Sequence, residues 1–218
     1  MDMQAMNALA KELIGARRVH AERETGGAYA HGQRVGETVL WLRRTLFPGA
    51  GAEDDVLRVA AWFHDIGKGV EPHARYGAAL AREALAGQCS AAELAQVCGL
   101  IGLHCARDPE NAQYPAAVRL LQDADLLDHY GTFTVWMEFL YSAFRDRSLL
   151  ETAGLNEAAW WKAHCAQYRA ELNYPISREI FDEKIAFVYA FYARMQVEAR
   201  GGVVWPGAAP TAEPPLKA

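Results

Sequence analysis

The chain has 218 residues, which is enough for one well-packed domain or for one domain with an appended helical lobe. Its residues are 51% hydrophobic and 22% charged, as in many globular proteins. The formal net charge of -5 and a sequence pI near 5.8 argue against a general nucleic-acid-binding or anionic-membrane-binding surface. Any anionic substrate must therefore be attracted by a local feature, such as a bound dication.

The four cysteines form no Cys-x-x-Cys pair, which argues against a zinc ribbon or a redox motif. They are interpreted as reduced, partly buried thiols: Cys89, Cys98, Cys105 and Cys165. The first residues lack the basic-then-apolar pattern of a signal peptide, and no stretch approaches the roughly 20 apolar residues of a membrane helix. We therefore expect a soluble, cytoplasmic protein that binds no membrane.

Apolar residues recur at helical spacing from the start of the chain. The helices predicted before residue 90 cover about residues 2–19, 29–47, 53–63 and 72–86. Gly26 and Gly27 predict a turn before the second helix, and Pro48 ends that helix. Acidic residues 53–55 open the third helix, where negative charge favours the positive end of the helix dipole.

Two more helices follow. Ser90 and Glu93 form the sequence pattern of a capping box, which predicts the start of the helix that carries His104. Asp108–Pro109 predicts a break. Pro115 then precedes a helix that carries Asp125.

Beyond residue 131 the chain becomes rich in aromatic residues at helical spacing. They are Phe133, Trp136, Phe139, Tyr141, Phe144, Trp160, Trp161, Tyr168, Phe181, Phe187, Tyr189, Phe191 and Tyr192. This spacing favours a core over a stacking platform, so we expect a helical lobe whose last long helix begins at Pro175. Glycine, proline and alanine over residues 201–218 predict an irregular, flexible tail. The predicted fold class is all-α.

We expect the functional site where an apolar run of residues ends in His64 and Asp65. A loop that contains Lys68 follows this pair. Neighbouring helix positions are about 100° apart, so both side chains can face one metal ion if the helix end points into a cleft. Lys68 could then reach an anion bound to that ion. A His-Asp pair at a helix end more often forms a hydrogen bond or a cap, so the remaining ligands must come from other segments.

Candidate ligands lie upstream and downstream of this pair, within segments that read as helices. The motifs are, in order, Tyr29–Val35, His64–Lys68, His73–Ala78, Ile101–His104 and Gln122–Asp128. Together, from Tyr29 to Tyr130, they resemble the HD superfamily of metal-dependent phosphohydrolases. The resemblance implies an HD-domain helical bundle with additional C-terminal helices. We expect a single domain over residues 1–200, with a metal-site half at about 20–130 and an aromatic-rich lobe at about 131–200.

The resemblance implies four metal ligands: His31, His64, Asp65 and Asp125. Two imidazoles and two carboxylates suit Mn²⁺, Fe²⁺, Co²⁺, Ni²⁺ or Zn²⁺, and Mg²⁺ is also an option. A water on such an ion is more acidic than bulk water, and the resemblance implies that this water hydrolyses the substrate. Asp65 and Lys68 are the expected catalytic residues, the lysine stabilising the phosphate in the transition state.

His73 and His104 decide whether the site holds one ion or two. His73 could instead be a histidine at a helix start, and His104 a satisfied core histidine. If both bind, Asp65 would bridge two ions. Dinuclear cyclic-dinucleotide phosphodiesterases of the superfamily carry a His-His pair where this chain has His104-Cys105, which argues against a cyclic dinucleotide substrate.

Three cationic residues are candidates for substrate contacts: Lys68, Arg34 and Arg75. An arginine on a helix face is, however, usually solvated or paired. Asp128, one turn after Asp125, could orient a ligand or lie at the surface. Asp123 is not expected to be a ligand, because the second aspartate of the Asp-Ala-Asp segment has that role in the family.

The sequence therefore predicts a metal-dependent phosphohydrolase for a small phosphorylated substrate, most simply a nucleotide. Two alternatives stay open: an HD-type di-iron oxygenase, whose ligand order is the same, and a non-catalytic metal-binding or nucleotide-binding regulatory module. No general nucleic-acid binding is expected. A homodimer formed through an apolar helix face is also open.

Overall fold

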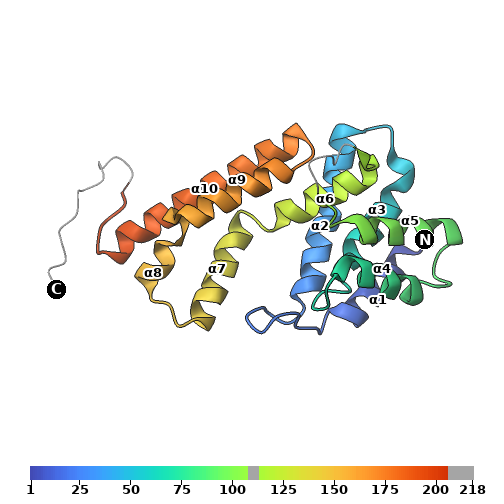
Figure 1. Ribbon diagram of the computed structural model, residues 1–218, viewed down its shortest axis with the longest axis horizontal. Helices are drawn as coiled ribbons and strands as arrows, with labels where there is room; N and C mark the ends of the chain where they lie inside the picture. The colour runs from blue at the N-terminus through green and yellow to red at the C-terminus, as the bar shows by residue number, and fades with distance from the viewer. Residues whose placement is uncertain (108–112, 206–218) are drawn as a thin grey trace. The chain divides into compact units, whose positions relative to one another are not determined.

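The structure is a computed structural model that describes residues 1–107 and 113–205. The predicted break at Asp108–Pro109 and the last part of the predicted tail, residues 206–218, lie outside the described residues. Within the described ranges every regular element is a helix, which confirms the all-α prediction (Figure 1). No helix in those ranges is both long and apolar enough to cross a membrane.

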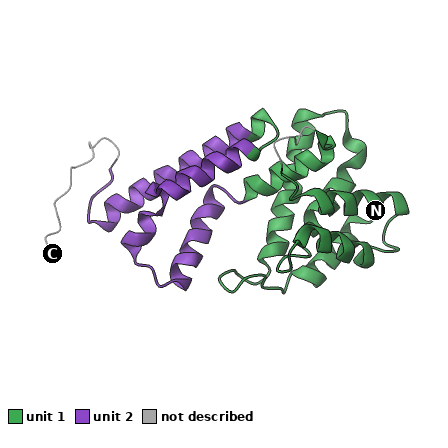
Figure 2. Cartoon of the chain, viewed as in Figure 1, with its two compact units in different colours: residues 1–128, 171–177 green, residues 129–170, 178–218 purple. Residues whose placement is uncertain are grey.

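The chain folds into two compact units (Figure 2). Unit 1 consists of residues 1–128 and 171–177, and unit 2 consists of residues 129–170 and the chain from residue 178 onward. The long helix α10 (Pro175–Ala199) begins in unit 1 and continues in unit 2. Pro175 starts this helix as predicted, because a proline at the first helical position needs no partner for a backbone N–H.

Among its described residues, unit 1 has helices α1 to α6 and the short 3₁₀ helix η1. They are α1 (Met3–Ile14), α2 (Gly27–Leu46), η1 (Gly51–Glu53), α3 (Asp54–Phe63), α4 (His73–Ala84), α5 (Ala91–Leu103) and α6 (Ala116–Asp128). Helix α2 packs against α3 and α6, α3 packs against α1 and α5, and α4 packs against α5. Val39 of α2, Phe63 of α3 and Leu121 of α6 are fully buried, so their apolar faces form the core of this unit.

The first helix ends at Ile14 and not, as predicted, at about Val19. The chain leaves the helix at Gly15, and Arg17 then donates hydrogen bonds to two carbonyl oxygens in the loop after Asp65. Those acceptors are the Ile66 oxygen at 2.5 Å and the Lys68 oxygen at 3.0 Å. The helix therefore ends before the apolar pattern ends, because Arg17 makes this tertiary contact.

Two glycines allow backbones to approach closely beside the His64–Asp65 turn. A Cβ atom at Gly32 of α2 would lie 2.9 Å from the carbonyl oxygen of Trp62 in α3. A Cβ atom at Gly67 would lie 2.6 Å from the backbone nitrogen of Gly77 in α4. These approaches, which a side chain would block, bring α2 and α4 against the end of α3.

The capping box predicted at the start of α5 is present. The backbone N–H of Ser90 donates to Glu93 Oε2 at 2.8 Å, and the backbone N–H of Glu93 donates to Ser90 Oγ at 3.3 Å. Two N–H groups that the helix leaves unpaired are thus satisfied by local side chains.

Asp123 of α6 attaches residues 171–177 to unit 1. Its fully buried carboxylate accepts hydrogen bonds from the backbone N–H and the side-chain amide of Asn173, both at 2.8 Å, and from the backbone N–H of Tyr174 at 3.1 Å. Asp123 is therefore a structural residue, in agreement with the prediction that it is not a metal ligand.

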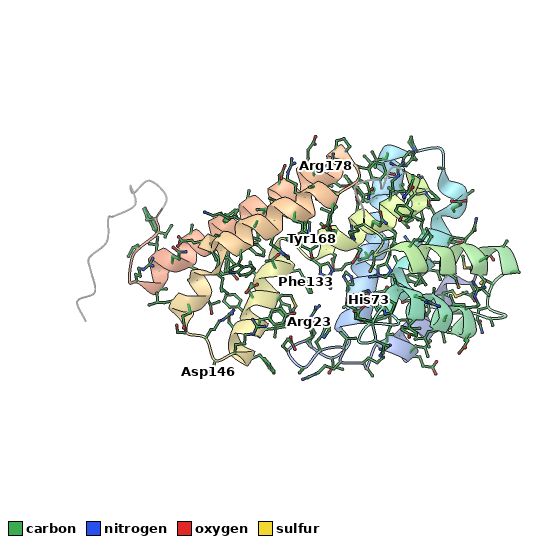
Figure 3. All side chains as sticks on the ribbon, in the orientation of Figure 1. Arg23, His73, Phe133, Asp146, Tyr168 and Arg178 are labelled. Carbon is green, nitrogen blue, oxygen red and sulfur yellow. The ribbon has the colours of Figure 1, made fainter. Side chains whose placement is uncertain are left out.

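Unit 2 contains α7 (Thr132–Phe144), α8 (Leu149–Ala153), the 3₁₀ helix η3 (Leu155–Glu157), α9 (Ala159–Glu171) and most of α10. Part of its aromatic set forms a core, since Tyr130 and Phe181 meet edge to face at 4.5 Å between centroids and Tyr192 is 1% exposed. Others, such as Trp136, are half exposed. Asp146 adopts a positive φ of 53° in the turn between α7 and α8, a conformation that aspartate tolerates (Figure 3).

Substituting Asp123→Ala is expected to lower the free energy of unfolding by about 2–3 kcal/mol, because it leaves the backbone N–H groups of Asn173 and Tyr174 without an acceptor. Urea denaturation followed by circular dichroism measures this change. Exposed Asp55→Ala is the control and should change stability little. Equal stability of the two variants would contradict the anchoring role of Asp123.

Candidate metal centre

Five helices of unit 1 bring the predicted ligands together. His31 lies on α2, His64 caps the C-terminus of α3 and is followed by Asp65, His73 opens α4, His104 caps α5, and Asp125 lies on α6. Three of the imidazoles are almost completely buried, with exposed fractions of 3% for His31 and 1% for both His64 and His104. Most of these residues stand at helix ends, where side chains from several helices can meet without interrupting the packing along each helix.

Each histidine is held by a hydrogen bond from its Nδ1 atom. His64 Nδ1 donates to the Ala61 carbonyl oxygen and His104 Nδ1 to the Ile101 carbonyl oxygen, both at 2.7 Å. A carbonyl oxygen can only accept, so the proton of the neutral imidazole lies on Nδ1. The Nε2 atoms of His64 and His104 therefore present lone pairs.

The two other histidines have carboxylate partners at Nδ1. Asp128 Oδ2 lies 2.8 Å from His31 Nδ1, and the Glu71 carboxylate lies 3.1 Å from His73 Nδ1. A carboxylate that accepts from Nδ1 fixes the same tautomer and makes Nε2 a better donor to a cation.

The Nε2 atoms of His31 and His64 lie 3.1 Å apart. Asp125 Oδ1 lies 3.1 Å from the first of these nitrogens and 3.6 Å from the second. Two lone pairs and a carboxylate oxygen at this separation repel one another unless a cation or a proton lies between them. This arrangement is suited to a metal ion.

Asp65 faces a second group of nitrogens as well as the first. Its Oδ1 atom lies 3.8 Å from His64 Nε2, 3.5 Å from His73 Nε2 and 3.8 Å from His104 Nε2. Lys68 Nζ lies 3.4 Å from the same carboxylate. The structure thus brings His73 and His104 beside the shared carboxylate.

The charges of the site favour an ionised Asp65. Burial alone would raise the pKa of this carboxyl group, but His64 and Lys68 outweigh burial and hold the pKa well below its usual range. Burial alone would lower the pKa of Lys68, but Asp65 and Asp125 raise it above its ordinary value. Asp65 therefore stays negative and Lys68 stays positive near neutral pH.

The buried histidines differ from one another. Burial alone would lower the pKa of His31, but hydrogen bonds to Asp125 and Asp128 raise it to about 9. Burial and the nearby His64 lower the pKa of His104 to about 4. His104 is therefore neutral and able to donate its lone pair at neutral pH.

The cationic candidates have different surroundings. Arg34 donates two hydrogen bonds to the Asp128 carboxylate, from Nη2 to Oδ2 at 2.7 Å and from Nε to Oδ1 at 2.8 Å. The Arg34 side chain is nevertheless 42% exposed. The sequence left open whether Asp128 orients a ligand or lies at the surface. Asp128 is 8% exposed and lies against His31, so it occupies the position of an orienting residue. Arg75 is exposed on α4. A substrate contact by Arg34 or Arg75 stays a prediction.

Sequence reasoning missed two arginines that support the site. Arg107 Nη2 donates to Asp125 Oδ2 at 3.1 Å and to the Gln122 carbonyl oxygen at 2.7 Å, and Arg17 holds the loop after Asp65. Neither arginine stands at a fixed helical spacing from its partner, so no local pattern indicates these pairs.

Substituting Asp128→Ala is expected to weaken metal binding by about 10–100-fold, because His31 loses the carboxylate that fixes its tautomer and orientation. Competition with a chromophoric chelator measures the affinity. The control Asp55→Ala removes an exposed carboxylate at the start of α3 and should leave the affinity unchanged. Wild-type affinity in Asp128→Ala would rule out the orienting role.

Comparisons with known proteins identify a domain family and related folds. Residues 28–130 match the family model of the HD domain. No curated protein sequence matches the chain. Solved structures with the same fold include Bacillus subtilis YpgQ, crystallised in complex with ADP (15% identity, covering 92% of this chain and 99% of that chain, TM-score 0.60).

Two further structures are described as HD-superfamily hydrolases. One, a predicted hydrolase from an uncultured Thermotogales bacterium, is 19% identical, with coverage of 90% of this chain and 92% of that chain and a TM-score of 0.56. The other, from Bacillus thuringiensis, is 15% identical, with coverage of 90% and 96% and a TM-score of 0.59. The matched segment contains the histidines and aspartates that converge in unit 1, and residues 28–130 are thereby identified as an HD domain.

Proposed function

We propose that this protein is a metal-dependent phosphohydrolase that cleaves a phosphoester or phosphoanhydride bond of a small phosphorylated substrate. The observation that carries the proposal is the convergence of four imidazole Nε2 atoms and two carboxylates beside a lysine that stays protonated. This donor set combines neutral nitrogen with anionic oxygen, which suits a divalent transition metal such as Mn²⁺, Fe²⁺, Co²⁺, Ni²⁺ or Zn²⁺.

The residues proposed to hold the first ion are His31, His64, Asp65 and Asp125. A bound dication supplies Lewis acidity and lowers the pKa of water, which are the two properties that phosphate hydrolysis needs. Asp128 and Arg107 orient ligands of this set through charged hydrogen bonds.

Lys68 is proposed to bind and stabilise the phosphoryl group. Its ammonium group lies 3.4 Å from Asp65 and its side chain is 27% exposed, so it is both fixed by a ligand and reachable from solvent. Positive charge held in this position offsets the negative charge that develops on phosphate oxygens in the transition state.

We propose a nucleotide as the substrate class. The solved structure of YpgQ contains ADP, and the two chains share a fold over most of their lengths. A diphosphate group carries the charge that a dication and Lys68 attract. A cytoplasmic location and a homodimer stay predictions of the sequence.

The proposal predicts release of phosphate or pyrophosphate from a panel of nucleoside mono-, di- and triphosphates and general phosphoesters, assayed with Mn²⁺, Co²⁺, Ni²⁺, Mg²⁺ and Zn²⁺ in turn. Asp65→Ala should abolish activity, because it removes the carboxylate between the two groups of nitrogens. Lys68→Ala should lower kcat by about 10²–10³-fold while leaving metal content unchanged, as expected for the loss of one charge-stabilising donor.

The matched control is Lys11→Ala, which removes an exposed lysine from α1 and should leave activity unchanged. No turnover of any substrate by folded, metal-loaded protein would contradict the proposal. Bound iron with oxygen consumption would then indicate the oxygenase alternative, and tight nucleotide binding without turnover would indicate a regulatory module.

A further inference from the structure

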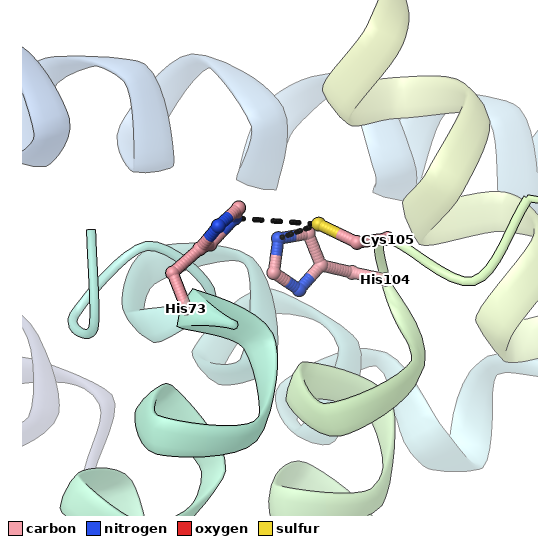
Figure 4. Close-up of side chains that lie close together, drawn as sticks. All are labelled: His73, His104 and Cys105. Atoms are coloured by element: carbon pink, nitrogen blue, oxygen red, sulfur yellow. Dashed lines mark hydrogen bonds between the residues drawn. The ribbon is translucent and has the colours of Figure 1, made fainter. Parts of the chain in front are cut away.

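A cysteine thiol lies among the nitrogens of the second group. Cys105 Sγ is 3.1 Å from His104 Nε2 and 3.3 Å from His73 Nε2 (Figure 4). These three ligand atoms lie within 4.8 Å of one another. They come from the start of α4 and from the two residues that follow α5, so two separate segments converge on one point.

The distances match those of a small coordination sphere. With ordinary bonds of about 2.0–2.1 Å to nitrogen and about 2.3 Å to sulfur, a tetrahedral ion separates neighbouring nitrogen and sulfur ligands by about 3.5 Å. The observed nitrogen-to-sulfur separations of 3.1 and 3.3 Å are close to this value. Asp65 Oδ1 lies 3.5 Å from His73 Nε2 and 3.8 Å from His104 Nε2, so its carboxylate faces the two imidazoles of this group.

The turn that carries Cys105 is rigidly held. The fully buried Gln122 donates from Nε2 to the carbonyl oxygens of Leu103, at 3.1 Å, and of Ala106, at 2.9 Å. Arg107, paired with Asp125, fixes the other end of the turn. The backbone on both sides of Cys105 is therefore fixed by polar contacts, which place the exposed Cys105 side chain beside the two imidazoles.

We propose that Cys105 is a ligand of a second metal ion, which it binds together with His73, His104 and the shared carboxylate of Asp65. The thiol loses its proton to solvent when the ion binds. A set of two imidazoles, one thiolate and one carboxylate favours Zn²⁺ or Co²⁺ over Mg²⁺ or Mn²⁺, because the soft sulfur ligand selects the softer ions. The two ion positions would then differ in metal preference, since only the second includes sulfur.

The inference deepens the proposed function and rests on it only in that both require metal in this site. The test uses the full-length protein loaded with Co²⁺, because a thiolate bound to Co²⁺ gives an intense near-ultraviolet charge-transfer band. The wild-type protein should show this band. Cys105→Ser should lose it and should bind the second Co²⁺ at least about tenfold more weakly, since loss even of an outer partner costs about 10–100-fold.

The matched control is Cys89→Ser, which removes a partly exposed thiol that contacts the Leu85 carbonyl oxygen and lies before α5. This variant should keep the band and two equivalents of Co²⁺. X-ray absorption of the Zn²⁺-loaded wild type provides a measurement without any substitution, with a sulfur neighbour expected at about 2.3 Å.

Wild-type protein without a charge-transfer band, or a band that persists in Cys105→Ser, would overturn the inference. Phosphate release that depends on Asp65 in the absence of the band would overturn the Cys105 assignment alone. A band that depends on Cys105, in a protein that hydrolyses no substrate, would support the assignment and overturn the phosphohydrolase proposal alone.

Discussion

The site of this protein depends on hydrogen bonds from the far side of each imidazole ring. Every histidine of the cluster directs its Nδ1 atom to an oxygen outside the cluster, and every Nε2 atom consequently faces inward. For His64 and His104 the acceptor is the carbonyl oxygen three residues earlier, at the end of the same helix. The last turn of a helix leaves such carbonyl oxygens without a backbone partner, so the helix end itself selects the tautomer.

A buried carboxylate among imidazole lone pairs is unfavourable without positive charge, and the protein supplies part of that charge itself. Lys68 lies beside Asp65, while Arg107 lies beside Asp125. Lys68 Nζ lies 3.4 Å from both oxygens of Asp65, and Arg107 contacts Oδ2 of Asp125 while Oδ1 faces His31 and His64. A dication among the nitrogens would remove the remaining repulsion.

The scaffold explains how ligands so far apart in the sequence come together. Glycines at positions 32 and 67 permit α2 and α4 to approach the end of α3 at distances that a Cβ atom would prevent. Asp123 lies two residues before the proposed ligand Asp125. It binds the backbone of residues 173 and 174 and so fixes α6 on the side away from Asp125. Helix α6 thus carries a structural carboxylate, Asp123, and a proposed ligand, Asp125, in two different environments. Asp123 is distinguished by its complete burial and its full set of hydrogen bonds.

Much of the fold follows from local patterns. Helical periodicity, the Ser90 capping box, the proline at the start of α10 and the ordered His and Asp motifs are properties of short segments, and each is present in the structure as the sequence indicates. The end of α1 is different, because Arg17 leaves the helix to bind carbonyl oxygens 49 and 51 residues away. A contact of that range has no signal in the local pattern.

The sequence by itself determined the helical class and the identity of the histidines and aspartates, since both depend on residue type and on spacing along the chain. Only the tertiary structure decided which of them meet. It brought His73 and His104 to Asp65, turned Asp128 toward His31, and placed the Cys105 thiol between two imidazoles. Ligand geometry depends on how helix ends converge, and that convergence results from packing among five helices that no single segment of the sequence encodes.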